Sequence, residues 1–85
     1  MVEELDIDLP LDLQTENESG LPYALLAHAR HPERIAEGEW IIVGSPNVNA
    51  VARVIEVRNG IVEVEPLHGP ARKWLHLIHR PARTA

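Results

Sequence analysis

The stretch WIIVGSPNVNAVARVIEVRNGIVEVEP, Trp40–Pro66, decides the fold of this chain of 85 residues. It contains three short apolar runs, and the dipeptide Asn59-Gly60 separates the last two. A type I′ hairpin turn needs positive φ at both central residues, and Asn and Gly adopt it at little cost. We therefore predict strands over 40–44, 51–57 and 61–66, with a two-residue turn joining the last two.

The two-residue turn also predicts a register, because residues on either side of it pair in order. One face is expected to be apolar, with the pairs Val57–Val62, Ile55–Val64 and Arg53–Pro66. The other face is expected to be mixed, with the pairs Arg58–Ile61, Glu56–Glu63 and Val54–Glu65.

Composition limits the core and the compartment. Hydrophobic residues make up 45% of the chain, but it has no Phe, one Tyr and two Trp, so Val, Ile, Leu and Ala must fill the core. Because Cys is absent, disulfides and thiolate metal sites are excluded, which fits the cytoplasm. No apolar run approaches the ~20 residues needed to span a bilayer. The start is acidic without an apolar signal segment. We expect a soluble, cytoplasmic protein with no membrane partner.

The net charge of −5 conceals a gradient along the chain. Residues 1–20 carry seven acidic residues and no Lys or Arg, whereas residues 67–85 carry four basic residues and no acid. We expect residues 1–20 to form a flexible acidic arm. The alternative is an edge strand, because apolar and acidic residues alternate from Leu5 to Leu13. Pro10 would confine such a strand to a sheet edge.

Two further segments carry secondary-structure signals. Residues 21–31 suit a helix by their Ala and Leu content, or a short buried strand; we favour a strand that passes into a helical turn near Arg30. Residues 70–80 show the helical spacing i, i+3, i+4, i+7, which predicts a short amphipathic helix. Its apolar stripe consists of Ala71, Trp74, Leu75 and Ile78.

The polar side of this predicted helix and the residues after it are basic, which suits a protein partner or nucleic acid. The residues are Arg72, Lys73, His76, His79, Arg80 and Arg83. The alternative is a face that is solvated or paired within the chain. Trp74 lies on the apolar stripe, so we expect it in the core rather than stacked on bases.

An acidic face is predicted on the hairpin, formed by Glu56, Glu63 and Glu65. Like charges that face each other on paired strands indicate solvent exposure or a basic partner. Nothing in the sequence places one carboxylate in an apolar pocket, so a general acid/base pair is not expected.

Two HxxH pairs, His28/His31 and His76/His79, have a spacing that could chelate a metal if helical. On a strand, His28 and His31 would point to opposite faces. We expect polar-face histidines and no metal or other cofactor. Catalytic motifs are also missing: there is no Cys, no GxSxG and no Gly-rich phosphate loop. We therefore expect a protein that is not an enzyme.

The pattern from Arg34 to Val64 resembles the SH3-like small β-barrels of the KOW and Tudor kind. In these barrels a glycine, here Gly38, precedes a strand of the W-I-x-V type, and a tight turn joins two further strands. The resemblance implies a mainly β, five-stranded, partly open barrel over 21–80, with 21–27 as its first strand, a short C-terminal helix and a tail over 81–85. The glycine expected in KOW motifs near Asn49-Ala50-Val51 is missing. Tyr23, Trp40 and Trp74 are too few for an aromatic methyl-lysine cage.

Barrels of this kind bind peptides or nucleic acid and rarely catalyse. We therefore expect a non-catalytic protein-interaction module that binds a protein partner or self-associates. The alternatives are a KOW-like nucleic-acid-binding domain that uses the basic helix, and a histidine metal site.

Overall fold

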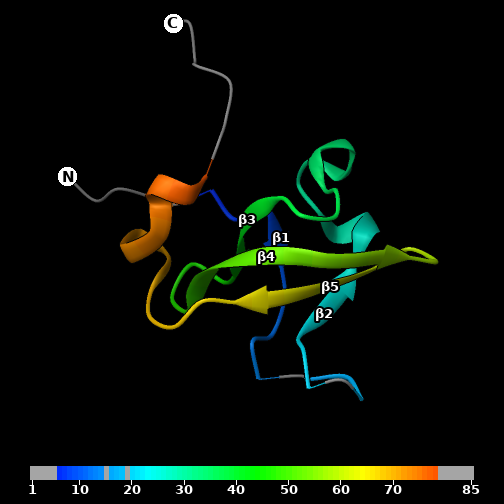
Figure 1. Ribbon diagram of the computed structural model, residues 1–85, viewed down its shortest axis with the longest axis horizontal. Coiled ribbons are helices and arrows are strands. Elements are labelled where there is room, and N and C mark those ends of the chain that lie inside the picture. The colour runs from blue at the N-terminus through cyan, green and yellow to red at the C-terminus, as the bar shows by residue number, and fades with distance from the viewer. Residues whose placement is uncertain (1–5, 15, 19, 79–85) are drawn as a thin grey trace, which may run out of the picture.

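Five strands form one sheet in the order β1-β3-β4-β5-β2, which curls into a nearly closed barrel (Figure 1). The computed structural model describes residues 6–14, 16–18 and 20–78. The strands are β1 (Leu9–Pro10), β2 (Tyr23–Leu25), β3 (Trp40–Gly44), β4 (Asn49–Arg58) and β5 (Ile61–Pro66). Three 3-10 helices accompany them, η1 (Leu26–His28), η2 (Pro32–Arg34) and η3 (Ala71–Leu77). The mainly β prediction is confirmed, and the shape is compatible with an SH3-like barrel.

The hairpin between β4 and β5 turns at Asn59-Gly60, as predicted. Asn59 has φ of 53° and Gly60 has φ of 77°, the positive values that a type I′ turn requires. Next to the turn the register follows the prediction, with Arg58 opposite Ile61, Val57 opposite Val62 and Glu56 opposite Glu63.

A β-bulge then shifts the register between Val54 and Glu56. Val54 lies opposite Val64 and both are buried, whereas Ile55 is 38% exposed. The predicted pairs Ile55–Val64, Val54–Glu65 and Arg53–Pro66 are therefore wrong; the structure pairs Arg53 with Glu65 and Ala52 with Pro66. The physical reason is that β4 contains one extra residue, Ile55, which has no partner on β5. The next residue of β4 to face the inside of the barrel is therefore Val54 instead of Ile55. Two adjacent β-branched residues suit the inner position equally well, so the sequence does not reveal the bulge.

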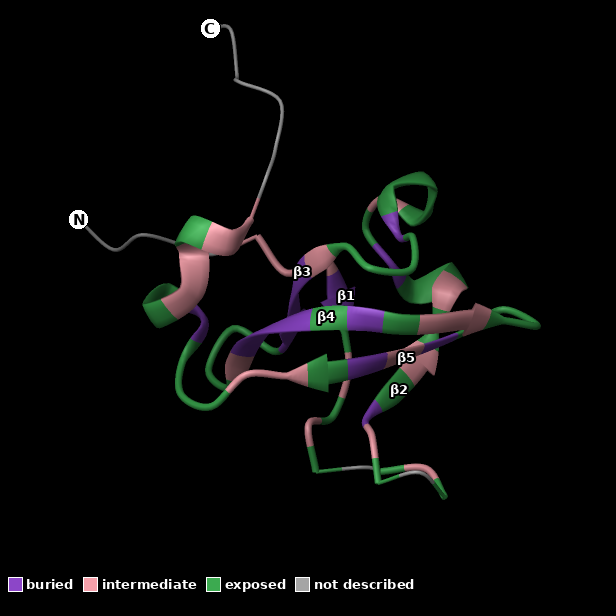
Figure 2. Ribbon diagram, viewed as in Figure 1, coloured by how far each residue is buried: buried purple, intermediate pink, exposed green. Residues whose placement is uncertain are grey.

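The two faces of the sheet bury two separate clusters. Figure 2 shows that the buried residues concentrate on the strands of the sheet. The inner cluster fills the barrel and consists mainly of Leu9, Ile35, Ile41, Val43, Ala50, Ala52, Val54, Val62 and Val64. On the outer face η3 packs over β3 and β4, where Ile42, Val51 and Ala71 are buried. Outer and inner residues alternate along β3 and β4 because successive side chains point to opposite faces of a sheet.

The described part of residues 1–20 includes a strand. β1 pairs in parallel with β3, Leu9 is fully buried and Pro10 is exposed. Of the two alternatives for this region, the edge strand is the one that forms at Leu9–Pro10. The strand is much shorter than the predicted alternation from Leu5 to Leu13, and Leu5 lies outside the described residues. Proline is tolerated there because an edge strand has one side without a partner.

Residues 21–31 form a short strand followed by helical turns, the interpretation favoured above. β2 runs antiparallel to β5, with Tyr23 opposite Glu63 and Leu25 opposite Ile61. Near the C-terminal end, η3 is a 3-10 helix interrupted at Trp74, where φ is −120° and ψ is 15°. Its predicted apolar residues do face the sheet: Ala71 is buried, and Trp74, Leu75 and Ile78 pack against the outer cluster.

Candidate functional site

Three of the predicted basic residues, Arg72, Lys73 and His76, are exposed on η3. None of them takes part in the ion pairs that the described part of the chain contains. The other three, His79, Arg80 and Arg83, lie outside the described residues. The structure thus keeps half of the predicted basic set together on one helix.

Trp74 is partly buried and is held in place by local contacts. Its indole Nε1 donates a hydrogen bond to the His68 carbonyl oxygen at 2.7 Å, and the ring packs against the outer cluster. The Lys73 Nζ lies 5.3 Å from the ring centroid, so a cation already occupies one face. Base stacking needs an accessible aromatic face, and Lys73 occupies one face of this partly buried ring.

The acidic side chains of the hairpin are divided among local partners. Glu56 faces Glu63, but its Oε1 lies 3.6 Å from Arg58 Nη1, and Asn17 Nδ2 donates a hydrogen bond to Glu63. Glu65 lies opposite Arg53 because of the bulge, not opposite Val54. The predicted acidic face therefore carries arginines of β4 alongside its carboxylates.

Among the described residues, the histidines do not form a metal-binding group. His28 is exposed at the end of η1, and His31 Nδ1 lies 3.5 Å from Glu33 Oε1. Across residues 6–14, 16–18 and 20–78, no group of three or more His, Cys, Asp or Glu side chains could hold a metal ion. His79 lies outside those ranges.

A surface that sequence reasoning missed lies at the end of the sheet that η3 leaves uncovered. Leu25 is 50% exposed, Ile61 is 42% exposed and Tyr23 is 40% exposed. Leu25 and Ile61 lie directly opposite each other, and Tyr23, two residues before Leu25 on β2, points to the same face. We call these three residues the outer patch. The hairpin register predicts Ile61 beside Arg58 on the mixed face, but no sequence signal predicts that β2 pairs with β5.

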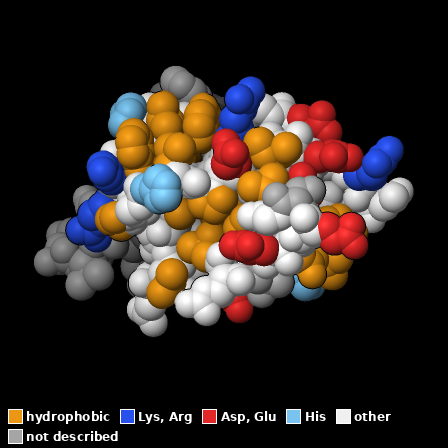
Figure 3. Space-filling model, turned by 60° about the horizontal axis from the view of Figure 1, so that its bottom comes forward, with side chains coloured by type: hydrophobic (Ala, Val, Ile, Leu, Met, Phe, Trp, Pro, Cys, Tyr) orange, Lys and Arg blue, Asp and Glu red, His pale blue; other side chains and the backbone are white. Residues whose placement is uncertain are grey.

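Charge differs between the two ends of the face shown in Figure 3. Several Lys, Arg and His side chains lie at one end, whereas Asp and Glu side chains lie mostly towards the other end, where a Lys or Arg side chain and a His side chain also lie. On the strands of the outer patch, Glu63 lies opposite Tyr23, and Glu56 lies beyond Glu63 on β4. The outer patch therefore combines apolar side chains with a charged border that contains Arg58, opposite Ile61, as well as the two carboxylates.

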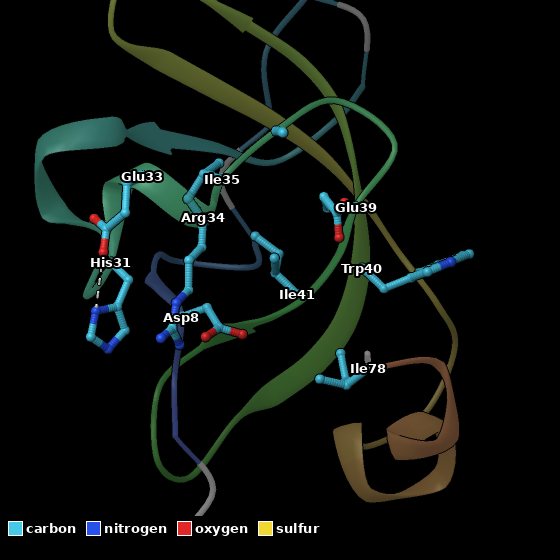
Figure 4. A pocket seen from close by; sticks show the side chains of 10 residues that line it. Asp8, His31, Glu33, Arg34, Ile35, Glu39, Trp40, Ile41 and Ile78 are labelled. Atoms are coloured by element: carbon cyan, nitrogen blue, oxygen red, sulfur yellow. Dashed lines mark ion pairs between the residues drawn. The ribbon is translucent and has the colours of Figure 1, made fainter. Parts of the chain in front are cut away.

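A cleft of about 350 Å³ opens beside the start of β3 (Figure 4). Its lining comes from four separate segments: Asp8 before β1; His31, Glu33, Arg34, Ile35 and Ala36 in and around η2; Glu39, Trp40 and Ile41 at β3; and Ile78 after η3. Ile35 and Ile41 are buried and supply apolar lining. No local motif joins these segments, so the sequence gives no signal of the cleft.

The charged side chains of the cleft are unequally engaged. Asp8 Oδ2 accepts a hydrogen bond from the Ile42 amide at 2.8 Å, and Glu33 lies beside His31. Figure 4 shows the Arg34 side chain running towards Asp8. The Glu39 carboxylate makes no hydrogen bond or ion pair within the described residues. The lining contains three carboxylates and one guanidinium, so it carries a net negative charge.

Comparisons with protein-family models, with curated proteins and with solved structures each found no match. Within the described part of the chain, no helix has the length and apolar character required to cross a membrane.

Proposed function

We propose that this chain is a non-catalytic protein-interaction module and that the outer patch contacts its partner. The observation that carries the proposal is the half-exposure of Tyr23, Leu25 and Ile61 on one sheet face. Scattered exposed apolar residues are ordinary, but adjacent ones with a polar border are typical of protein-binding surfaces. Here Leu25 and Ile61 are directly paired.

The chemistry of the outer patch suits a protein. Full burial of a Leu or Ile side chain is worth roughly 1.5–3 kcal/mol, so covering the remaining half of this pair supplies part of a binding energy. Tyr is enriched at protein interfaces because it offers apolar area together with a hydroxyl. The border contains Glu56 and Glu63 together with Arg58, so it would favour a partner with charged residues of both signs around an apolar centre.

The strand pattern from Arg34 to Val64 supports the same class. It resembles small barrels of the KOW and Tudor kind, which bind peptides or nucleic acid. The surface offers apolar side chains inside a border in which Arg58 is already paired with Glu56, so a protein or peptide fits it better than a nucleic acid does. A cytoplasmic location belongs to the proposal as well, and the partner is either another protein or a second copy of this chain.

Site-specific photo-crosslinking in cells tests the proposal. Ile61 is replaced by p-benzoylphenylalanine, and Val48, which is exposed in the β3–β4 loop, receives the same replacement as a matched control. We expect discrete adducts from position 61 and none of them from position 48. An adduct with a second copy would identify self-association. The same adducts from both positions, or none from position 61, would refute the proposal.

Nucleic-acid binding by η3 is a second candidate, favoured by the exposure of Arg72, Lys73 and His76 without acidic partners in the described residues. It predicts that log K falls with log salt by about 0.7–0.9 for each phosphate contacted. Fluorescence anisotropy with single- and double-stranded RNA and DNA tests this, with the Arg72→Gln/Lys73→Gln variant as control. Binding that is insensitive to the double substitution would exclude η3 as the interface.

A further inference from the structure

We infer that the cleft beside β3 is a second binding site, which accepts an arginine side chain from a basic segment of a protein partner. The inference rests on the proposed role in protein interaction but uses a different surface from the outer patch. It depends on one observation: the Glu39 carboxylate, which has no hydrogen bond or ion pair among the described residues, lines the same cleft as the buried apolar residues Ile35 and Ile41.

The shape of the cleft suits a long cationic side chain. Arginine has an apolar stem of three methylene groups and a charged end, and such side chains lay the stem on apolar surface and keep the end near polar groups. Ile35, Ile41 and Ile78 offer apolar surface to the stem. In Figure 4 the Glu39 carboxylate points into the space between Ile41 and Trp40. A volume of about 350 Å³ lies at the small end of the range for ligand pockets, enough for one side chain with part of its backbone.

Charge selects the occupant. Asp8, Glu33 and Glu39 line the cleft against the single guanidinium of Arg34, so the local potential favours a cation and opposes phosphate or carboxylate ligands. Asp8 and Glu33 already have neighbours, which leaves Glu39 as the principal acceptor. A guanidinium can donate two parallel hydrogen bonds to one carboxylate, so arginine recognises Glu39 more specifically than a lysine ammonium would.

The test uses the full chain and a small probe, the acetylated and amidated tripeptide Ala-Arg-Ala. The matched neutral probe is Ala-citrulline-Ala, which has nearly the same shape without the charge. Titrations are followed by ¹H–¹³C methyl and ¹H–¹⁵N NMR spectra. We expect saturable shifts of the Ile35 and Ile41 methyl signals with the arginine probe and binding about tenfold weaker with citrulline, the usual size of a lost charge-assisted hydrogen bond.

Substitutions assign the interaction to the cleft. Glu39→Gln should weaken binding of the arginine probe by about tenfold. Glu65→Gln, an exposed carboxylate on the outer face, should leave binding unchanged. Equal affinity for both probes, absence of shifts at Ile35 and Ile41, or no binding would overturn the inference. Tighter binding by the Arg80→Gln/Arg83→Gln variant would also overturn it, because the chain's own residues 79–85 would then be the occupant. Each result leaves the photo-crosslinking outcome at position 61 unaffected, so the two proposals fail separately.

Discussion

Leu25 lies directly opposite Ile61 across the β2–β5 pairing, and both side chains remain about half exposed. Directly opposite residues whose backbone groups do not bond each other bring their side chains closest in an antiparallel ladder. The flanking hydrogen bonds, from Leu26 N to the Gly60 carbonyl and from Val64 N to the Pro22 carbonyl, place Leu25 and Ile61 in that type of pair. The two side chains therefore form one continuous apolar surface on the part of the sheet that η3 does not cover.

The outer patch should contribute little to stability. Leu25→Ser combined with Ile61→Thr should lower the free energy of unfolding by about 1 kcal/mol or less, because both side chains are already half in water. Urea unfolding followed by Trp fluorescence measures this. A loss of several kcal/mol would show that the pair is structural rather than available for a partner.

Leu9 should be required by the barrel although it lies in the acidic N-terminal region. It is fully buried between β3 and the inner cluster, so Leu9→Ala should cost about 2–5 kcal/mol. Leu25→Ala, at an exposed position, is the matched control and should cost much less. Equal losses in urea unfolding would mean that β1 does not belong to the core.

The bulge predicts a difference between two adjacent residues. Val54→Thr replaces a buried methyl group by a hydroxyl without a partner and should cost about 1–3 kcal/mol. Ile55→Thr should stay within about 1 kcal/mol, because Ile55 faces solvent. Both variants keep a β-branched residue, so strand propensity hardly changes. If Ile55→Thr were the more destabilising variant, Ile55 would be the buried residue, and the bulge between Val54 and Glu56 would be contradicted.

Gly44 should be the glycine least tolerant of substitution. Its φ is 116°, and an added Cβ would stand 2.3 Å from the Val48 carbonyl oxygen. Gly44→Ala should therefore cost several kcal/mol or prevent folding. Gly38 also has positive φ, of 89°, but nothing lies within 4 Å of its Cβ position, so Gly38→Ala should cost only about 1–2 kcal/mol. Thermal unfolding of both variants compares the two effects; similar losses would contradict the close approach at Gly44.

Local chemistry determines which parts of this fold the sequence reveals. Asn59-Gly60 specifies its turn because few other residues tolerate both φ values, and the strands on either side follow from alternation. The apolar spacing around Trp74 likewise identifies the covered face of η3, although the 3-10 geometry does not follow from spacing. The bulge at Ile55 is invisible because its neighbour Val54 is equally apolar.

The candidate sites depend on pairings between distant segments, which no local pattern encodes. β1 joins β3 in parallel across more than 30 residues, and the cleft needs Asp8, Glu39 and Ile78 to meet. The sequence predicts one residue of the outer patch, because the hairpin register places Ile61 on the outer face. The other two residues, Tyr23 and Leu25, could be predicted only if the pairing of β2 with β5 were known.

The central claim is that the outer patch binds a protein, and quantitative affinity capture from cell extract tests it most directly. Three immobilised chains are compared: the natural sequence, the Leu25→Ser/Ile61→Thr variant and, as control, Val48→Thr in the β3–β4 loop. We predict that a defined set of proteins is retained equally by the natural chain and by Val48→Thr, and at least about tenfold less by the patch variant, as expected when central interface residues are truncated. Retention of the same set at the same level by all three folded chains would contradict the account.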